Sequence, residues 1–216
     1  MTTTTAHEIK QRPRHERRLR EILKVSARVF AEEGYEKASI RRIAGELGQS
    51  LSALYHYVRT KEELLFLIQR ETFSSLAETL VERLEAAADP EERLRLMVEN
   101  HVGHFVRHID ELKVCAHEME SLSGDAYREV LEIRRRYFRA ARSVVADALR
   151  HFDNDRLDPN LATLNLFGML NWIYMWYDPE RNSSAKELAD QIAGLFLYGL
   201  ASGKALPRSG RGGKEG

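Results

Sequence analysis

The sequence predicts an all-α fold, on the strength of three observations. Apolar residues recur at spacings of three and four along most of the chain, which places them on one face of a helix. No stretch alternates apolar and polar residues, as a half-buried strand would. Residues typical of helix starts and ends, such as Ser39, Gly48 and Pro90, divide the chain into about nine helices.

The first helix is predicted over residues 15–33. Its inward stripe contains Leu19, Ile22, Ser26 and Phe30, at helical spacing. Gly34 follows and should end the helix, because glycine readily takes the left-handed conformation that a helix end requires. The polar residues 1–12 before this helix are expected to form a disordered arm.

Residues 39–65 hold two short helices joined by a tight turn. Ser39 can cap the first of them, Gly48 ends it, and Leu54 faces inward from the second. The outer face of the second helix carries small or hydrogen-bonding side chains, namely Gln49, Ser50, Ser52, Ala53, His56 and Tyr57. A short helix with apolar anchors behind and such residues in front can enter a DNA major groove. This stretch therefore predicts a helix-turn-helix DNA-binding protein.

Six further helices are predicted from their start and end signals. Thr60 to Glu63 and Ser184 to Glu187 have capping-box spacing, and Pro90 and Pro159 suit a first helical position. A break is expected at Ser123. The predicted ranges are 61–88, 90–109, 111–122, 125–151, 159–177 and 184–202.

The basic residues concentrate at the front of a chain whose net charge is +0. Residues 1–61 hold 13 Lys and Arg against 7 Asp and Glu, a net charge of +6, whereas residues 62–216 hold 20 against 26, a net charge of −6. Only the front end is expected to face a polyanion. The basic arm, with Lys10, Arg12, Arg14, Arg17 and Arg18, is either a solvated tail or a contact with DNA phosphates.

The remaining composition favours a cytoplasmic protein of two domains. Cys115 is the only cysteine, and the N-terminus has no apolar segment of the secretory type. The apolar stretch 161–177 is short for a membrane span and is expected to be a buried helix. We expect a DNA-binding domain over residues 1–60, a ligand-binding and dimerisation domain over 61–205, and a disordered tail over 206–216.

Residues 22–65 resemble the tetracycline-repressor (TetR) family of bacterial transcription regulators. The resemblance rests on F-x-E-x-G-Y from Phe30, R-x-I-A-x-x-L-G from Arg41, and L-Y-H-Y from Leu54 followed by T-K-E-E-L from Thr60. It implies a three-helix DNA-binding head on a larger all-α domain that binds a ligand and dimerises. The implied partner is a palindromic double-stranded operator, and the implied place of action is the nucleoid of a bacterial cytoplasm.

The resemblance also implies which residues contact DNA. They lie at the start of the second helix, along the recognition helix and at the start of the fourth helix, where a backbone N–H and an ammonium can both meet a phosphate. Val58 departs from the phenylalanine usual in the family. The implied positions are Ser39, Arg41 or Arg42, Gln49, Ser50, Leu51, Ser52, Ala53, Tyr55, His56, Tyr57 and Lys61.

The second half is similar to regulators of fatty-acid and acyl-CoA catabolism. The similarity lies in Glu118-x-x-Ser121-Leu-Ser, the arginine-rich run ending at Tyr137, Gly168-Met-Leu-Asn171-Trp, and Trp176-Tyr-x-Pro. It implies an acyl-CoA thioester as effector and no cofactor. An apolar tunnel would hold the acyl chain, and arginines would meet the phosphates of coenzyme A. The candidate ligand-binding residues are His101, Phe105, Arg134, Arg135, Tyr137, Phe138, Met169, Asn171, Trp172 and Met175.

Other interpretations stay open for these residues. The aromatic and Met stripe is also typical of a core, and the arginines alternate with glutamates as on a solvated face. Another hydrophobic effector, as in multidrug regulators, is an alternative. A metal sensor is another, since His101, His104 and His108 lie at helical spacing. No glycine-rich phosphate loop and no nucleophile elbow is present, so an enzyme is not expected.

The last two helices are expected to form a two-fold four-helix dimer interface. Their predicted interface residues are Leu166, Leu170, Ile192, Leu195, Phe196 and Gly199. Such a dimer would place two recognition helices about 34–36 Å apart, one turn of DNA. Ligand in the second domain would shift the fourth helix and spoil that spacing, so that the repressor leaves its operator.

Overall fold

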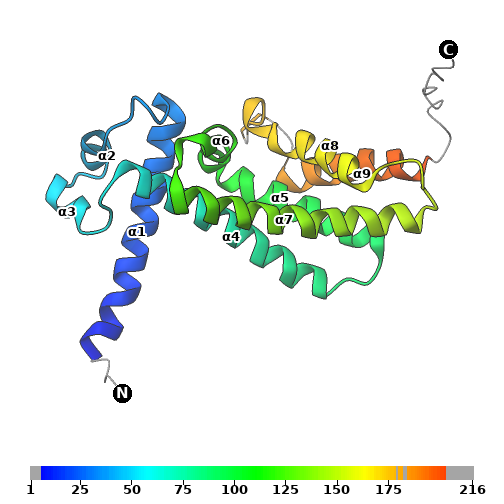
Figure 1. Ribbon diagram of the computed structural model, residues 1–216, viewed down its shortest axis with the longest axis horizontal. Coiled ribbons are helices and arrows are strands. Elements are labelled where there is room, and N and C mark those ends of the chain that lie inside the picture. The colour runs from blue at the N-terminus through cyan, green and yellow to red at the C-terminus, as the bar shows by residue number, and fades with distance from the viewer. Residues whose placement is uncertain (1–5, 179, 182–183, 203–216) are drawn as a thin grey trace, which may run out of the picture.

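The chain is all-α, as predicted. The computed structural model describes residues 6–178, 180–181 and 184–202, and these residues form nine α-helices, two short 3₁₀ turns and no strand. Figure 1 shows an elongated molecule with a small head at one end, formed by the first three helices, and a long helical body. The tail over 206–216, predicted to be disordered, lies outside the described residues.

The head consists of α1 (Ala6–Glu33), α2 (Ile40–Glu46) and α3 (Leu51–Tyr55). Gly34 and Gly48 have positive φ values of 81° and 62°, so both predicted glycine stops are confirmed. The first helix begins at Ala6, nine residues before the predicted start, and residues 6–12 are therefore helical. Most of these residues are good helix formers, so their polarity was a poor indicator of disorder.

The body consists of six helices. They are α4 (Lys61–Glu85), α5 (Pro90–Arg107), α6 (Ile109–His117), α7 (Gly124–His151), α8 (Pro159–Asn171) and α9 (Ala185–Ala201). In Figure 1, α4, α5 and α7 run along the body, and α8 and α9 lie together on one side of them. None of the described helices combines the length and apolarity that a membrane span requires.

Two predicted helices end earlier than expected, and each is followed by a 3₁₀ turn. α6 stops at His117, with a turn at Met119–Ser121, and α8 stops at Asn171, with a turn at Ile173–Met175. Continuous apolarity after Asn171 suggested a longer helix, but the amide of Asn171 is hydrogen-bonded to another helix and marks the change of path.

Helix α4 takes part in two separate cores. Leu64, Leu65 and Ile68 belong to the core of the head, whereas Leu76 and Leu80 belong to the core of the body. The head core also includes three residues of the body helices and their connection, Val114, Leu122 and Val130. The packing of the head therefore extends beyond residue 60, and one continuous helix belongs to both cores.

Candidate DNA-binding surface and effector site

Helix α3 is anchored by its apolar side and presents its polar side outward. Leu54 and Val58 are 0% and 1% exposed, so both are core residues of the head. Ser52, Tyr55 and His56 are exposed, and Tyr55 keeps half of its surface accessible. This is the arrangement expected of a recognition helix, whose anchors are buried and whose outer side chains are available for base edges.

Two residues beside α3 are held by α1. The ring of Tyr57 stacks on that of His15, with ring centroids 4.7 Å apart, and the amide of Gln49 lies against the guanidinium of Arg18. The long first helix thus supports the recognition helix from its N-terminal half. Leu51 and Ala53 are half-buried between these contacts and the surface.

Ser39 and Ser50 are helix caps. The Ser39 hydroxyl accepts a hydrogen bond from the Arg42 N–H and the Ser50 hydroxyl accepts one from the Ala53 N–H, both at 3.2 Å. In each case the hydroxyl proton is still available, because a serine oxygen can accept one hydrogen bond while donating another. A cap serine can therefore position a helix and donate to a phosphate at the same time.

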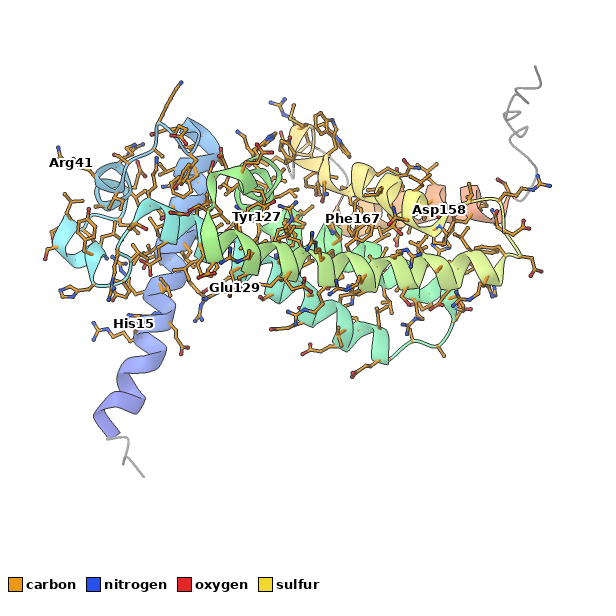
Figure 2. The ribbon with its side chains drawn as sticks, viewed as in Figure 1. His15, Arg41, Tyr127, Glu129, Asp158 and Phe167 are labelled. Atoms are coloured by element: carbon orange, nitrogen blue, oxygen red, sulfur yellow. The ribbon has the colours of Figure 1, made fainter. Side chains whose placement is uncertain are left out.

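The structure distinguishes the two arginines at the start of α2. Arg42 is ion-paired with Glu33, at 3.0 Å, and with Glu46. These partners raise the pKa of Arg42 further above its usual value, led by the hydrogen bond to Glu33. Arg41 is exposed and forms no ion pair with any described residue, and Figure 2 shows it at the outer edge of the head. Arg41 is thus the better placed of the two for a phosphate.

Lys61 uses its ammonium inside the protein. Its Nζ donates to the carbonyl oxygens of Tyr35 at 2.7 Å and Glu36 at 3.2 Å, and lies 4.2 Å from the centroid of the Tyr35 ring. Thr60 caps α4 by accepting from the Glu63 N–H at 3.0 Å. The main-chain N–H of Lys61, at the first position of α4, is the group left to meet a phosphate.

The head and the start of α4 are hydrogen-bonded to the rest of the body at several places. The Lys113 ammonium on α6 donates to the Ala31 carbonyl oxygen on α1 at 2.5 Å, and two carboxylates bond at the connection between α6 and α7. Glu62 accepts from the N–H and the hydroxyl of Ser123 at 2.9 and 2.7 Å. Glu118 joins the same boundary, because its carbonyl accepts from the Gln69 amide at 3.1 Å and its carboxylate accepts from the Tyr35 N–H at 3.4 Å. Both contacts bring the first turns of α4 and the loop before α2 to the connection between α6 and α7.

A polar network is buried inside the body. His101 on α5 is 2% exposed, and its ring nitrogens lie 3.1 Å from the Tyr137 hydroxyl and 3.1 Å from the Asn171 amide oxygen. Because the amide oxygen only accepts, Nε2 carries the proton and donates to Asn171, while Nδ1 accepts from Tyr137. Burial lowers the pKa of His101 to about 3 and raises that of Tyr137, so both groups are neutral at pH 7.

Aromatic rings surround this network. The His101 ring lies 4.8 Å from Phe105 and 5.6 Å from Phe167, and Phe138 lies 5.9 Å from Phe167. Five of the candidate ligand residues are thus brought together, from α5, α7 and α8. Phe167 was missed, although its position four residues before Asn171 places both on one helix face.

The other candidate ligand residues lie elsewhere. Met169 on α8, and Trp172 and Met175 after its end, are 36%, 56% and 58% exposed. This stretch is apolar on every side, so its sequence does not indicate which face turns inward. Arg135 is exposed. Arg134 is half-buried, with its guanidinium 4.9 Å from the Phe73 ring and 3.4 Å from the Cys115 carbonyl oxygen.

The three histidines of the metal alternative do not share one site. His101 is turned into the body network, whereas His104 and His108 lie with ring centroids 4.9 Å apart at the α1 side of α5. The part of the chain that the structure describes contains no cluster of three His, Cys, Asp or Glu side chains suited to a metal ion. Cys115 is 3% exposed, and burial raises the pKa of its thiol to about 12.

Helices α8 and α9 carry an exposed apolar face that contains only part of the predicted set. Leu195 and Gly199 are exposed and Phe196 is half-buried, so these three positions are accessible. Leu166, Leu170 and Ile192 are at most 7% exposed and pack in the body core. The opposite side of the two helices is accessible, and its large apolar side chains are 50% to 80% exposed. They are Leu161, Leu164, Trp172, Leu195 and Tyr198.

Two family models match the chain. Residues 22–68 match "Bacterial regulatory proteins, tetR family", and residues 87–200 match "Tetracyclin repressor-like, C-terminal domain". The first covers the second half of α1, α2, α3 and the first turns of α4, and the second covers most of the body.

Proteins similar to the chain along most of its length include solved structures and a curated regulator. PfmR from Thermus thermophilus is 31% identical, with 82% of this chain and 96% of that chain covered and a TM-score of 0.74. AibR, solved with isovaleryl coenzyme A and operator DNA, is 27% identical, with 82% and 97% covered and a TM-score of 0.73. The fatty acid metabolism regulator protein of Bacillus subtilis (strain 168) is 20% identical over 182 residues, which are 83% of this chain and 94% of that protein.

Proposed function

Because the chain belongs to the TetR family of bacterial regulatory proteins, we propose that it is a homodimeric repressor released from a palindromic operator by an acyl-CoA thioester. Members of this family are DNA-binding transcription factors and not enzymes. The chain is accordingly a TetR-type transcriptional repressor, and the effector, the dimer and the contact residues form the proposal.

In this proposal the head binds DNA through two kinds of contact. The hydroxyls of Ser39 and Ser50, the guanidinium of Arg41 and the main-chain N–H of Lys61 bind phosphates and set the register on the duplex. The face of α3 with Ser52, Tyr55 and His56 reads base edges, and Gln49, Leu51, Ala53 and Tyr57 line its edges. Arg42 supports this surface through its ion pairs with Glu33 and Glu46.

The dimer forms through the exposed face of α8 and α9. On α9, Leu195 and Tyr198 are 69% and 80% exposed, and on α8, Leu161 and Trp172 are 60% and 56% exposed. Apolar surface of this extent on two adjacent helices favours a partner, and a two-fold axis would pair the two helices with those of a second copy. The two heads would then bind operator half-sites about 34–36 Å apart.

The observation that carries the effector proposal is the neutral network of His101, Tyr137 and Asn171 inside an aromatic cluster. The thioester carbonyl of an acyl-CoA accepts a hydrogen bond from His101 Nε2 in place of the Asn171 amide. The acyl chain packs among Phe105 and Phe138. Arg134 and Arg135, one turn from this cluster, meet the phosphates of coenzyme A. AibR, solved with isovaleryl coenzyme A and operator DNA, supports this class of effector.

Release from DNA follows from the path of α4. An acyl chain that enters beside His101 displaces α8 and presses on the body segment of α4, which moves the head because Leu64 and Leu65 belong to the head core. The operator affinity falls only as far as the ligand prefers the displaced form over the DNA-bound form. The reciprocal effect is that the operator weakens acyl-CoA binding by the same factor.

The test is operator binding in the presence of acyl-CoAs of increasing chain length. An operator selected from random duplexes is labelled, and its affinity is measured by fluorescence anisotropy with each acyl-CoA, with free coenzyme A and with the free acid. We expect at least one acyl-CoA to weaken operator binding more than tenfold, and Asn171→Ala to alter that response. Asn160→Ala, an exposed position on the same helix, is the matched control.

Two outcomes would change the proposal. If no acyl-CoA changes the operator affinity of the dimer, the effector part of the proposal is wrong, and the DNA-binding part is unaffected. Release by hydrophobic compounds without coenzyme A would favour the multidrug type of regulator instead.

A further inference from the structure

A cavity lies at the boundary between the head and the body. It has a volume of about 320 Å³, is open to solvent on one side, and is lined by α1, α4, α5 and the start of α6. None of the residues of the His101 network lines it. Its volume is within the range of small-ligand pockets. The cavity is therefore a separate candidate site, one that the effector proposal does not use.

The two sides of this cavity carry opposite charges. Arg20 and Lys24 line it from α1, and both are exposed and form no ion pair with any described residue. Glu71 lines it from α4 and Glu111 from α6. Glu71 likewise has no ion-pair partner in the described part of the chain, and Glu111 lies 3.6 Å from His108. Cations thus come from the head and carboxylates from the body, without pairing across the cavity.

An imidazole in the wall lacks a hydrogen-bond partner. His104 lines the cavity, and its ring packs against the rings of Phe105 and His108. No ring nitrogen of His104 is hydrogen-bonded to a described residue. Burial, assisted by His108 and Arg107, lowers the pKa of His104 to about 4, so the ring is neutral at pH 7 with one donor and one acceptor. The ring is half-buried, so its two nitrogens can bond to water or to a ligand in the cavity.

Apolar and hydroxyl groups form the rest of the wall. Leu23 from α1 and Ile68 from α4 are buried core residues with one surface toward the cavity, and Thr72 and Ser75 add hydroxyls from α4. A ligand with an apolar part can therefore pack against Leu23 and Ile68 while its polar groups reach the charged walls.

We infer that this cavity binds a small zwitterion of the α-amino-acid class. Its carboxylate lies toward Arg20 and Lys24, its ammonium lies toward Glu71 and Glu111, and its side chain packs on Leu23. A simple anion would leave the carboxylates of the body unmatched, and a simple cation would leave the two α1 cations unmatched. A zwitterion satisfies both sides, and it contacts the head and the body at once.

The test is a binding screen on the full chain. The twenty proteinogenic amino acids are titrated by calorimetry, and each binder is compared with its deaminated acid and its decarboxylated amine. We expect one-to-one binding of at least one amino acid and a loss of more than tenfold in affinity for both analogues. Binding of none of the twenty, or equal binding of an analogue, would overturn the inference.

Three variants test whether the amino acid binds in this cavity. Lys24→Met and Glu71→Gln each remove one charge from the cavity and should weaken binding more than tenfold. Glu78→Gln, an exposed position two turns along α4 and outside the cavity, should leave the affinity unchanged. The melting temperature of each variant without ligand verifies folding. An amino acid that binds Glu71→Gln and Lys24→Met as tightly as the unchanged chain occupies another site, and the inference is then wrong. None of these measurements uses an acyl-CoA, so their failure leaves the effector proposal intact.

Discussion

Glu62 holds Ser123 by two hydrogen bonds, one from the backbone N–H at 2.9 Å and one from the hydroxyl at 2.7 Å. Ser123 is the N-cap residue of α7, but its own side chain does not cap the helix. The Glu62 carboxylate, from the first turn of α4, instead accepts from the N–H and the hydroxyl of this N-cap residue, where it also lies near the positive end of the α7 dipole. The residue next to Lys61 is thus bonded directly to the start of α7.

Removal of this contact should loosen the head from the body. Ser123→Ala keeps the N–H bond and should lower the free energy of unfolding by about 0.5–1.5 kcal/mol, whereas Glu62→Ala loses both bonds to a charged acceptor and should lower it by about 1.5–3 kcal/mol. Urea denaturation measures both values. Ser143→Ala, an exposed site on α7, serves as control. If Glu62→Ala were as stable as the control, the contact would contribute nothing.

Arg41 and Arg42 should differ in what their loss affects. Arg41→Ala should weaken operator binding at all sequences and reduce the slope of log affinity against log salt by about one for each protomer, since a phosphate contact is lost. Arg42→Ala should instead lower the melting temperature, because Glu33 and Glu46 lose their shared partner. Anisotropy at several salt concentrations and calorimetry separate the two effects. The reverse pattern would exchange the roles of the two arginines.

Stability should fall below pH 6.5 because of His101. In the unfolded chain a histidine takes up a proton near pH 6.5, whereas folded His101 stays neutral down to about pH 3. Its contribution is complete above pH 6.5 and declines as the pH falls from 6.5 to about 3, by about 1.4 kcal/mol per pH unit. His104, with a pKa of about 4, adds an equal slope down to that pH.

His101→Leu should therefore flatten the pH profile of stability by one proton between about pH 6 and 4. Tyr137→Phe removes a hydrogen bond to the same ring but no group that titrates in this range, so its profile should run parallel to that of the unchanged chain. Urea midpoints at half-unit pH intervals provide the measurement. Parallel profiles for His101→Leu would show that folded His101 takes up its proton over the same pH range as in the unfolded chain.

Charge on the exposed face of α9 should prevent dimerisation. Leu195→Glu would place a carboxylate in a four-helix interface, where burial of an unpaired charge is strongly unfavourable. We expect a monomer by light scattering and an operator affinity at least tenfold weaker, because one monomer reaches only one half-site. Val81→Glu, at a site 51% exposed on α4, is the matched control. A dimer that persists with Leu195→Glu would place the interface elsewhere.

Local signals predicted the elements well, because they depend on neighbouring residues alone. The caps at Ser39, Thr60 and Ser184 form the expected hydrogen bonds, and Ser184 with Glu187 completes a capping box. Packing could not be predicted where a helix is apolar all round. In α8, Leu166 turns inward and Leu164 outward, and only contact with α5 and α7 decides which residue is core.

The polar contacts between residues far apart in the chain could not be predicted from the sequence either. Nothing in the spacing of Arg41 and Arg42 indicates that Glu33 and Glu46 converge on the second arginine. The same holds for Lys61, whose ammonium turns inward because the chain returns past Tyr35, 26 residues earlier. Such contacts depend on tertiary distance, which helical periodicity does not report.

The buried thiol of Cys115 can serve as a natural probe of local opening in the body. Alkylation requires a thiolate that reagent can reach, and burial in the body denies both conditions. The rate at which iodoacetamide labels this cysteine therefore reports how often the region around α6 opens locally, without any introduced probe. A ligand that stabilises the body would lower the labelling rate of Cys115, and one that destabilises it would raise that rate. The response of the body to a ligand could therefore be measured in the unmodified protein.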